Sequence, residues 1–104
     1  SAWEIEGLVN SHKFVSESAA LAIPALVGED DILVIIIRKK KSRKSLFSYA
    51  NYYKTKFSKL SFPRYWAFID QFPRTPTQRI DKKLIEIKKL QVMDYNKKKL
   101  LKLS

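Results

Sequence analysis

Apolar and polar residues alternate along the chain with spacings that switch between the helical period and the extended period. In chain order they predict a helix at 3–12, strands at 15–23 and 32–37, a helix at 46–57, a strand at 64–70 and a helix at about 81–90. Because residues 32–37 are an uninterrupted apolar run, both faces of that strand should be covered. The predicted fold class is α+β, with helices packed on a small three-stranded sheet in the order helix-strand-strand-helix-strand-helix.

Capping and breaking residues delimit these elements. Ser1 and Glu4 have the spacing of a capping box, and Ser45 is a candidate cap for the second helix. A helix that begins at the first residue indicates a sequence that starts inside a longer protein. Pro24 ends the first strand because proline has no amide donor, and two prolines make 71–79 an extended surface loop.

The C-terminal part is the least defined by pattern. Ile80, Leu84 and Ile87 are expected to face inward from the third helix. Residues 91–104 form a lysine-rich tail that either continues this helix or frays, so the predicted domain covers residues 1–90.

Composition narrows the class of protein. A chain of 104 residues fits one domain with a true core, and the lack of cysteine excludes a disulfide scaffold and a thiolate metal site. The longest apolar run has six residues, too few to cross a bilayer, so no membrane partner is expected. A cytoplasmic location agrees with the lack of cysteine.

The net charge of +11 raises the question of an anionic partner. Six of the seven residues from Arg38 to Lys44 are basic, and further clusters lie within 79–89 and 97–102. These clusters fall on predicted loops and exposed helix faces, so a solvated lysine-rich surface is the preferred interpretation. A nucleic acid is an unlikely partner on this evidence.

The histidine, the acidic cluster and the aromatic residues of the sequence are each expected to have a structural role. His12, the single histidine, lies at a helix end with no Ser, Cys or second His arranged to use it, and is expected to pack or cap. The three acidic residues of 29–31 are expected to form a solvated turn, and no metal site is predicted. The aromatic residues of 64–70 are not expected to stack on bases, because Trp66, Phe68 and Ile69 face both sides of the strand as core residues do.

The loop Pro73–Ile80 carries a family resemblance. It reads Pro-Arg-Thr-Pro-Thr-Gln-Arg-Ile and follows the strand that begins at Phe62-Pro63-Arg64-Tyr65. With the opening stretch Trp3-Glu4-Ile5-Glu6, this succession resembles the C-terminal domain of the adenylate-forming superfamily. That superfamily includes acyl-CoA synthetases, luciferases and peptide-synthetase adenylation domains. The resemblance covers about residues 1–90 and is closest to acyl-CoA and carnitine-type CoA ligases.

The resemblance implies a function and its cofactors. Such enzymes use ATP and Mg²⁺ to activate a carboxylic acid as an acyl-adenylate, and then transfer the acyl group to coenzyme A. The C-terminal domain swings over a large N-terminal adenylation domain, which is the implied partner. A lysine of the final loop reaches the reacting centre in the first step. The chain by itself is expected to be inactive and to bind none of these cofactors.

The sequence departs from the family pattern at that loop. The family's Gly-Lys pair is Gln78-Arg79 here, so Arg79 takes the lysine position as the candidate catalytic residue and Lys82 is a possible substitute. Thr75, Thr77 and Gln78 are the candidate cofactor-binding residues of the loop. Two alternatives stay open: a small basic module that binds nucleic acid or an acidic surface, and a degenerate homologue without catalytic activity.

Overall fold

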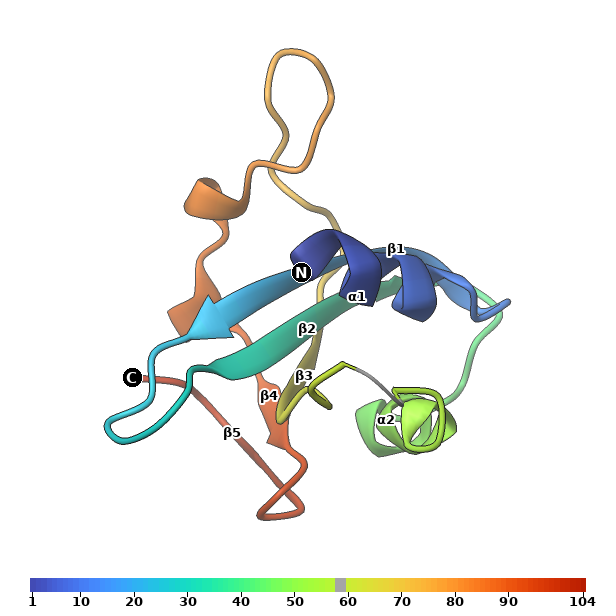
Figure 1. Cartoon of the computed structure of the whole chain (residues 1–104). Helices are drawn as coiled ribbons and strands as arrows, with labels where there is room; N and C mark the ends of the chain where they lie inside the picture. The colour runs from blue at the N-terminus through green and yellow to red at the C-terminus, as the bar shows by residue number, and fades with distance from the viewer. Residues whose placement is uncertain (58–59) are drawn as a thin grey trace.

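A computed structural model describes residues 1–57 and 60–104 and contains two helices and a mixed sheet (Figure 1). In chain order the elements are α1 (Ala2–Asn10), β1 (Val15–Ile23), β2 (Asp31–Arg38), α2 (Leu46–Tyr53), β3 (Tyr65–Phe68), β4 (Val92–Asp94) and β5 (Lys99–Leu101). In the described residues the sheet has five strands in the order β1-β2-β3-β4-β5. Of the strand pairs in this described part of the chain, only β2–β3 is parallel. The α+β class is confirmed.

The helices begin where the caps predict. The Ser1 and Glu4 side chains form a complete capping box on α1, and Ser45 caps α2 by accepting the amide of Ser48. Both helices lie over one face of the sheet (Figure 1). There Tyr53 of α2 stacks on Trp66 of β3, with ring centroids 5.6 Å apart. The Tyr53 hydroxyl donates to the Val9 carbonyl of α1 at 2.6 Å, which joins the helices around the aromatic core.

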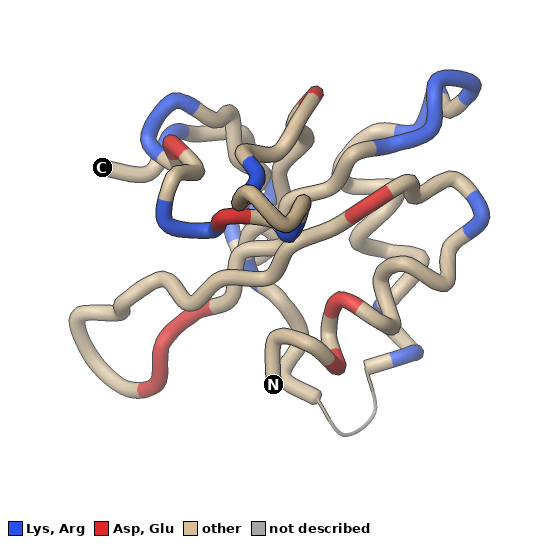
Figure 2. Tube along the Cα trace, turned by 90° about the horizontal axis from the view of Figure 1, so that it is seen from above, with Lys and Arg blue, Asp and Glu red and all other residues tan. Residues whose placement is uncertain are grey.

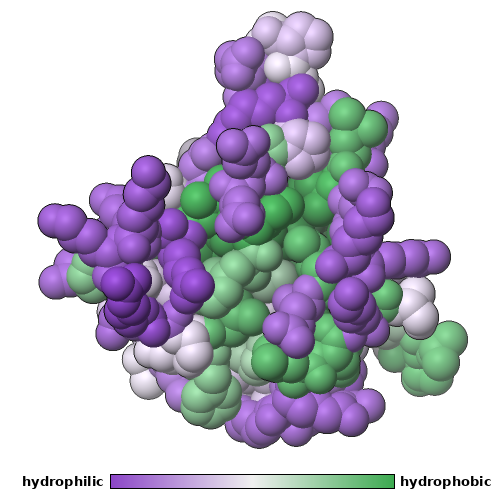
Figure 3. Space-filling model, turned by 180° about the vertical axis from the view of Figure 1, so that it is seen from behind, coloured by the Kyte–Doolittle hydropathy of each residue, from purple (hydrophilic) through white to green (hydrophobic). Residues whose placement is uncertain are grey.

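The opposite face of the sheet is covered by segments that are not α-helical in the described structure. Leu33 and Ile35 of β2 lie there, buried together with Phe72, Ile85 and Val92. Viewed from behind, this side has apolar side chains in its middle and polar ones around the margin (Figure 3). As the apolar run predicts, β2 is therefore covered on both faces.

The predicted third helix is wrong. Residues 81–90 contain two short 3₁₀ turns, Lys82–Leu84 and Ile87–Lys89, joined by extended backbone at Ile85. Leu84, predicted to face inward, is 62% exposed, whereas Ile85 is buried. The apolar spacing here matches a helix, but each turn is too short to keep that register, and packing on the sheet selects the neighbouring residue.

The predicted three-stranded sheet is also incomplete, because the tail adds β4 and β5. Residues 91–104 neither continue a helix nor fray; β4 pairs with β3 and β5 pairs with β4, both antiparallel. The turn between them includes Lys98 in the left-handed region, with φ of 55°. Residues 91–104 thus belong to the same sheet as the predicted domain 1–90.

Candidate functional site

The loop that carries the family resemblance projects away from the sheet (Figure 1). Arg74 and Ile80 pair across its base as an antiparallel bridge. Above that bridge the Thr75 amide donates to the Arg79 carbonyl at 2.8 Å, and below it the Asp81 amide donates to the Pro73 carbonyl at 2.8 Å. The segment is therefore a narrow ribbon closed by a turn, which we call the Arg79 loop (residues 73–81).

Gln78 occupies the turn position where the family has glycine. Its φ of 71° lies in the left-handed region, which a residue with a side chain adopts at a cost of about 1–2 kcal/mol. The Gln78 amide donates to the Thr75 carbonyl at 2.9 Å, and its own carbonyl accepts from Arg74 at 3.1 Å. The loop thus keeps a turn of the kind that glycine favours, closed by hydrogen bonds to the Gln78 backbone.

Arg79 is fixed by its backbone and exposed at its side chain. Its amide donates to Oγ1 of Thr75 at 3.2 Å, so Thr75 contacts both the amide and the carbonyl of Arg79. The hydroxyls of Thr75 and Thr77 are 3.1 Å apart. Across residues 1–57 and 60–104, no carboxylate forms an ion pair with Arg79. Its guanidinium is available to an anion from outside the chain.

Lys82, the possible substitute, is placed differently. Its ammonium lies 2.7 Å from Oε2 of Glu6 and donates to the Ala20 carbonyl at 2.9 Å. Lys82 therefore points back to α1 and β1, while the exposed Lys83 beside it makes no ion pair within the described parts of the chain.

A shallow depression of about 410 Å³ joins these candidate groups. Two threonines and three cationic residues line it together with one apolar and one acidic residue: Thr75, Thr77, Arg79, Lys82, Lys83, Ile80 and Asp81. Hydroxyl donors and positive charge are the groups that bind phosphate or carboxylate oxygens. Gln78 lies outside this lining and contributes its backbone turn.

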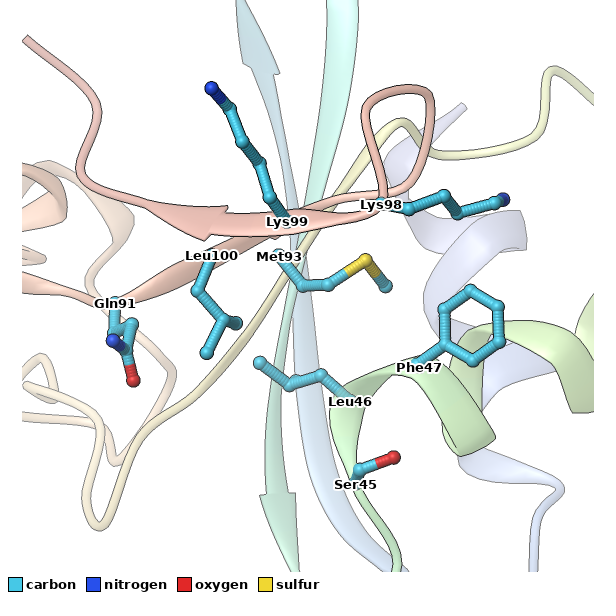
Figure 4. Close-up of a pocket in the computed structure, with 8 residues that line it drawn as sticks. All are labelled: Ser45, Leu46, Phe47, Gln91, Met93, Lys98, Lys99 and Leu100. Atoms are coloured by element: carbon cyan, nitrogen blue, oxygen red, sulfur yellow. The ribbon is translucent and has the colours of Figure 1, made fainter.

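A second, larger hollow of about 570 Å³ lies between the start of α2 and the β4–β5 hairpin. Leu46, Met93 and Leu100 point into it, while Lys99 points away (Figure 4). None of its lining residues belongs to the Arg79 loop. Its lining is mainly apolar, with Ser45, Gln91 and Lys98 as polar groups, and it lacks the cluster of hydroxyls and cations found at the loop, so the candidate chemistry stays with the loop.

The basic segment Arg38–Lys44 forms a turn at the edge of the molecule (Figure 2). It is held by Ser42, which is buried and accepts from the Tyr49 hydroxyl at 2.7 Å. Arg38 caps the turn by donating to the Lys44 carbonyl at 2.9 Å, and the other basic residues of the segment are exposed. Exposed charge on a fixed turn agrees with the solvated surface that the pattern predicts.

His12 packs in the core and caps a turn, as predicted. It is 6% exposed, its Nδ1 accepts the Phe14 amide at 2.9 Å, and its ring centroid lies 4.4 Å from that of Tyr52. Burial lowers the pKa of His12, and the positive charges of Lys44 and Lys13 lower it further. The imidazole is therefore kept neutral and serves as an acceptor.

Stability should depend on pH through His12. The unfolded chain binds this proton more readily than the folded chain, so the contribution is complete above the ordinary pKa of 6.5. It decreases as the pH falls from there through the lower folded value. Urea unfolding between about pH 8 and about pH 5 should show this decrease, and His12→Asn, which keeps an acceptor for Phe14, should remove it. An unchanged pH profile in the variant would contradict the assignment.

Sequence reasoning did not identify Arg74, Glu17 and Glu6, which take part in the ion pairs on either side of the loop. Arg74 pairs with Glu17 of β1, from which it is separated by 57 residues. Such long-range pairs leave no local spacing signal in a single sequence.

The described residues contain no group of three or more His, Cys, Asp or Glu side chains placed to hold a metal ion. No described helix has the length and apolar content to span a membrane.

Known proteins similar to this chain are acyl-CoA synthetases and related ligases, although no family model matches it. It is 25% identical over 82 residues to the oxalate–CoA ligase of Saccharomyces cerevisiae, covering 79% of this chain and 15% of that protein. ATP-bound MatB from Rhodopseudomonas palustris aligns with a TM-score of 0.71 and 20% identity, over 80% of this chain and 16% of the other. A Mycobacterium tuberculosis fatty acyl CoA synthetase aligns with a TM-score of 0.67 and 25% identity, over 78% and 16%.

The chain thus spans about one-sixth of the length of these relatives. The shared portion has the α+β fold described above and includes most of this chain. Sequence pattern and fold together confirm the resemblance: this chain is similar to the C-terminal domain of the adenylate-forming superfamily.

Proposed function

We propose that this chain is the mobile C-terminal domain of a cytoplasmic, ATP-dependent acyl-CoA synthetase, with the Arg79 loop as its catalytic element. The observation that carries the proposal is the exposed Arg79 guanidinium, presented on a pinned ribbon with no carboxylate partner in the described structure. The matched relatives are CoA ligases and synthetases by name, which supports this class.

The charge of Arg79 suits a reaction centre where phosphate and carboxylate oxygens meet. Adenylation brings two anions together, and a fixed cation there stabilises the transition state more than the separated reactants. Because the Arg79 backbone is held by Thr75, only its side chain has to adjust on contact. Movement of the whole domain would deliver this cation for adenylation and withdraw it for acyl transfer.

The loop suits one anionic group and offers no cleft for a whole nucleotide. Thr75, Thr77 and Arg79 supply donors around a shallow depression whose lining has no aromatic side chain to stack on an adenine ring and a single apolar one, Ile80. The adenine site, the acyl pocket and the ligands of Mg²⁺ therefore belong to the partner adenylation domain in this proposal. Bound ATP would supply the adenylyl group, and coenzyme A the thiol that accepts the acyl group.

The test is acyl-dependent exchange of pyrophosphate into ATP in the polypeptide that joins this chain to its adenylation domain. The intact polypeptide should catalyse exchange with a carboxylic acid from a panel of short, long and dicarboxylic acids. Removal of this chain should abolish most of the exchange. If the intact polypeptide shows no exchange with any acid, the alternative of a degenerate homologue replaces the proposal.

A further inference from the structure

We propose that two ion pairs, Arg74–Glu17 and Lys82–Glu6, clamp the two flanks of the Arg79 loop onto β1 and α1. In this view, which rests on the proposed function, Arg74 and Lys82 are positioning residues for Arg79. Lys82 then holds the loop in place and does not replace Arg79 at the reaction centre.

The first clamp joins the rising flank of the loop to β1. Arg74 directs one guanidinium nitrogen to the Glu17 carboxylate and another to the Gln78 carbonyl at 3.1 Å. One planar group therefore links the strand, the base of the loop and its turn. Lysine has no such fork and could not make both contacts with the same geometry.

The second clamp joins the returning flank to α1 and to the outer side of β1. Glu6 accepts the Ala20 amide at 2.8 Å, and Lys82 donates to the Ala20 carbonyl at 2.9 Å. The two side chains contact each other at 2.7 Å. Lys82 and Glu6 thus satisfy both polar groups of Ala20, and this ties the segment after the loop to a fixed point on the sheet.

The loop has little else to set its direction. Within the described residues, the hydrogen bonds of 75–79 run inside the loop or to Arg74. Apolar anchoring begins at Phe72 on one side and Ile80 on the other. A ribbon held only at its base can tilt, and a small displacement of a catalytic group costs a large factor in rate. The two clamps oppose that tilt from both flanks.

The clamp can be tested on this chain by amide hydrogen exchange followed by NMR. Arg74→Met and Lys82→Met should each raise exchange at the Gln78 and Arg79 amides by about two- to fivefold, and the double variant by about tenfold. Exchange at Ile35 in the core should stay unchanged, which separates local loosening from unfolding. Lys88→Met, which removes an exposed lysine outside the loop, is the matched control.

Exchanging the charges of the first pair gives a sharper test. Glu17→Arg and Arg74→Glu should each loosen the loop. The combined variant should recover part of the protection at Arg79, because the ion pair is restored but a glutamate at position 74 cannot donate to the Gln78 carbonyl. Lys82→Arg should keep protection because a cation remains opposite Glu6. If the Arg74→Met, Lys82→Met double variant leaves exchange at the loop unchanged, the clamp is overturned.

The positioning role is tested in the polypeptide that includes the adenylation domain. The clamp variants should lower kcat for adenylation while the KM values for ATP and acid and the rate of acyl transfer to thiol stay near wild type. The positioning role is overturned if the clamp variants loosen the loop but adenylate at the wild-type rate while Arg79→Ala is impaired. An unimpaired Arg79→Ala overturns the proposed catalytic role instead, and the clamp is then judged on exchange alone.

Discussion

Replacing Arg79 by alanine is expected to lower the rate of acyl-adenylate formation by about 10²- to 10³-fold, the cost of removing one charge-stabilising donor. The side chain is exposed and makes no ion pair within the described residues, so its removal should leave the fold intact. Acyl-dependent pyrophosphate exchange measures the effect, and hydrolysis or thiol transfer of a supplied acyl-adenylate should stay near the wild-type rate.

Two further variants separate the role of Arg79 from a general effect of charge. Arg43→Ala removes an exposed arginine of the basic turn and should leave the rate of pyrophosphate exchange unchanged. Arg79→Lys brings in the ammonium of the family pattern and should lose less activity than Arg79→Ala, since a positive charge stays at this position. If Arg79→Ala and the wild type catalyse pyrophosphate exchange at the same rate, Arg79 does not act at the reaction centre.

The largest effect on stability is expected at Arg64. Its Nε and Nη2 donate to the two carboxylate oxygens of Asp94 at 3.1 and 3.0 Å. Asp94 is 1% exposed, so Arg64→Met leaves a buried carboxylate without its cation and should lower the free energy of unfolding by about 3–5 kcal/mol. The pairing also joins the start of β3 to the end of β4.

The remaining partners of Asp94 sharpen this test. Burial alone would raise the pKa of Asp94, but Arg64 and the amides of Lys97 and Asn96 together lower it below its ordinary value. In urea unfolding near neutral pH, the added change Asp94→Asn should recover part of the loss in Arg64→Met, because the unpaired charge is gone. A loss below about 1 kcal/mol in Arg64→Met would show that solvent replaces the guanidinium.

Local pattern accounts for the first part of the fold. The caps at Ser1 and Ser45 and the apolar run of β2 are written in neighbouring residues, and all three form as predicted. The tail is different, because β4 is short and contains a buried charge, Asp94, whose partner Arg64 lies 30 residues earlier. A pattern that scores apolar periodicity cannot recognise such a strand.

The candidate site divides in the same way. The loop, its turn and Arg79 follow from contiguous residues, so they could be identified from the sequence. The contacts of Arg74 with Glu17 and of Lys82 with Glu6 depend on how the loop packs on β1. Spacing alone makes Lys82 a candidate catalytic substitute, and only its contacts with Glu6 and Ala20 support another proposed role.

The position of Lys82 has a consequence for whether β1 can pair with a strand of another molecule. β1 is the outer strand of the sheet, and such strands invite addition of a strand from another molecule. At Ala20 the backbone amide and carbonyl, which an added strand would need as hydrogen-bond partners, are already bonded to Glu6 and Lys82. An incoming strand would have to break an ion pair and desolvate both charges, which works against amyloid-like stacking at this edge.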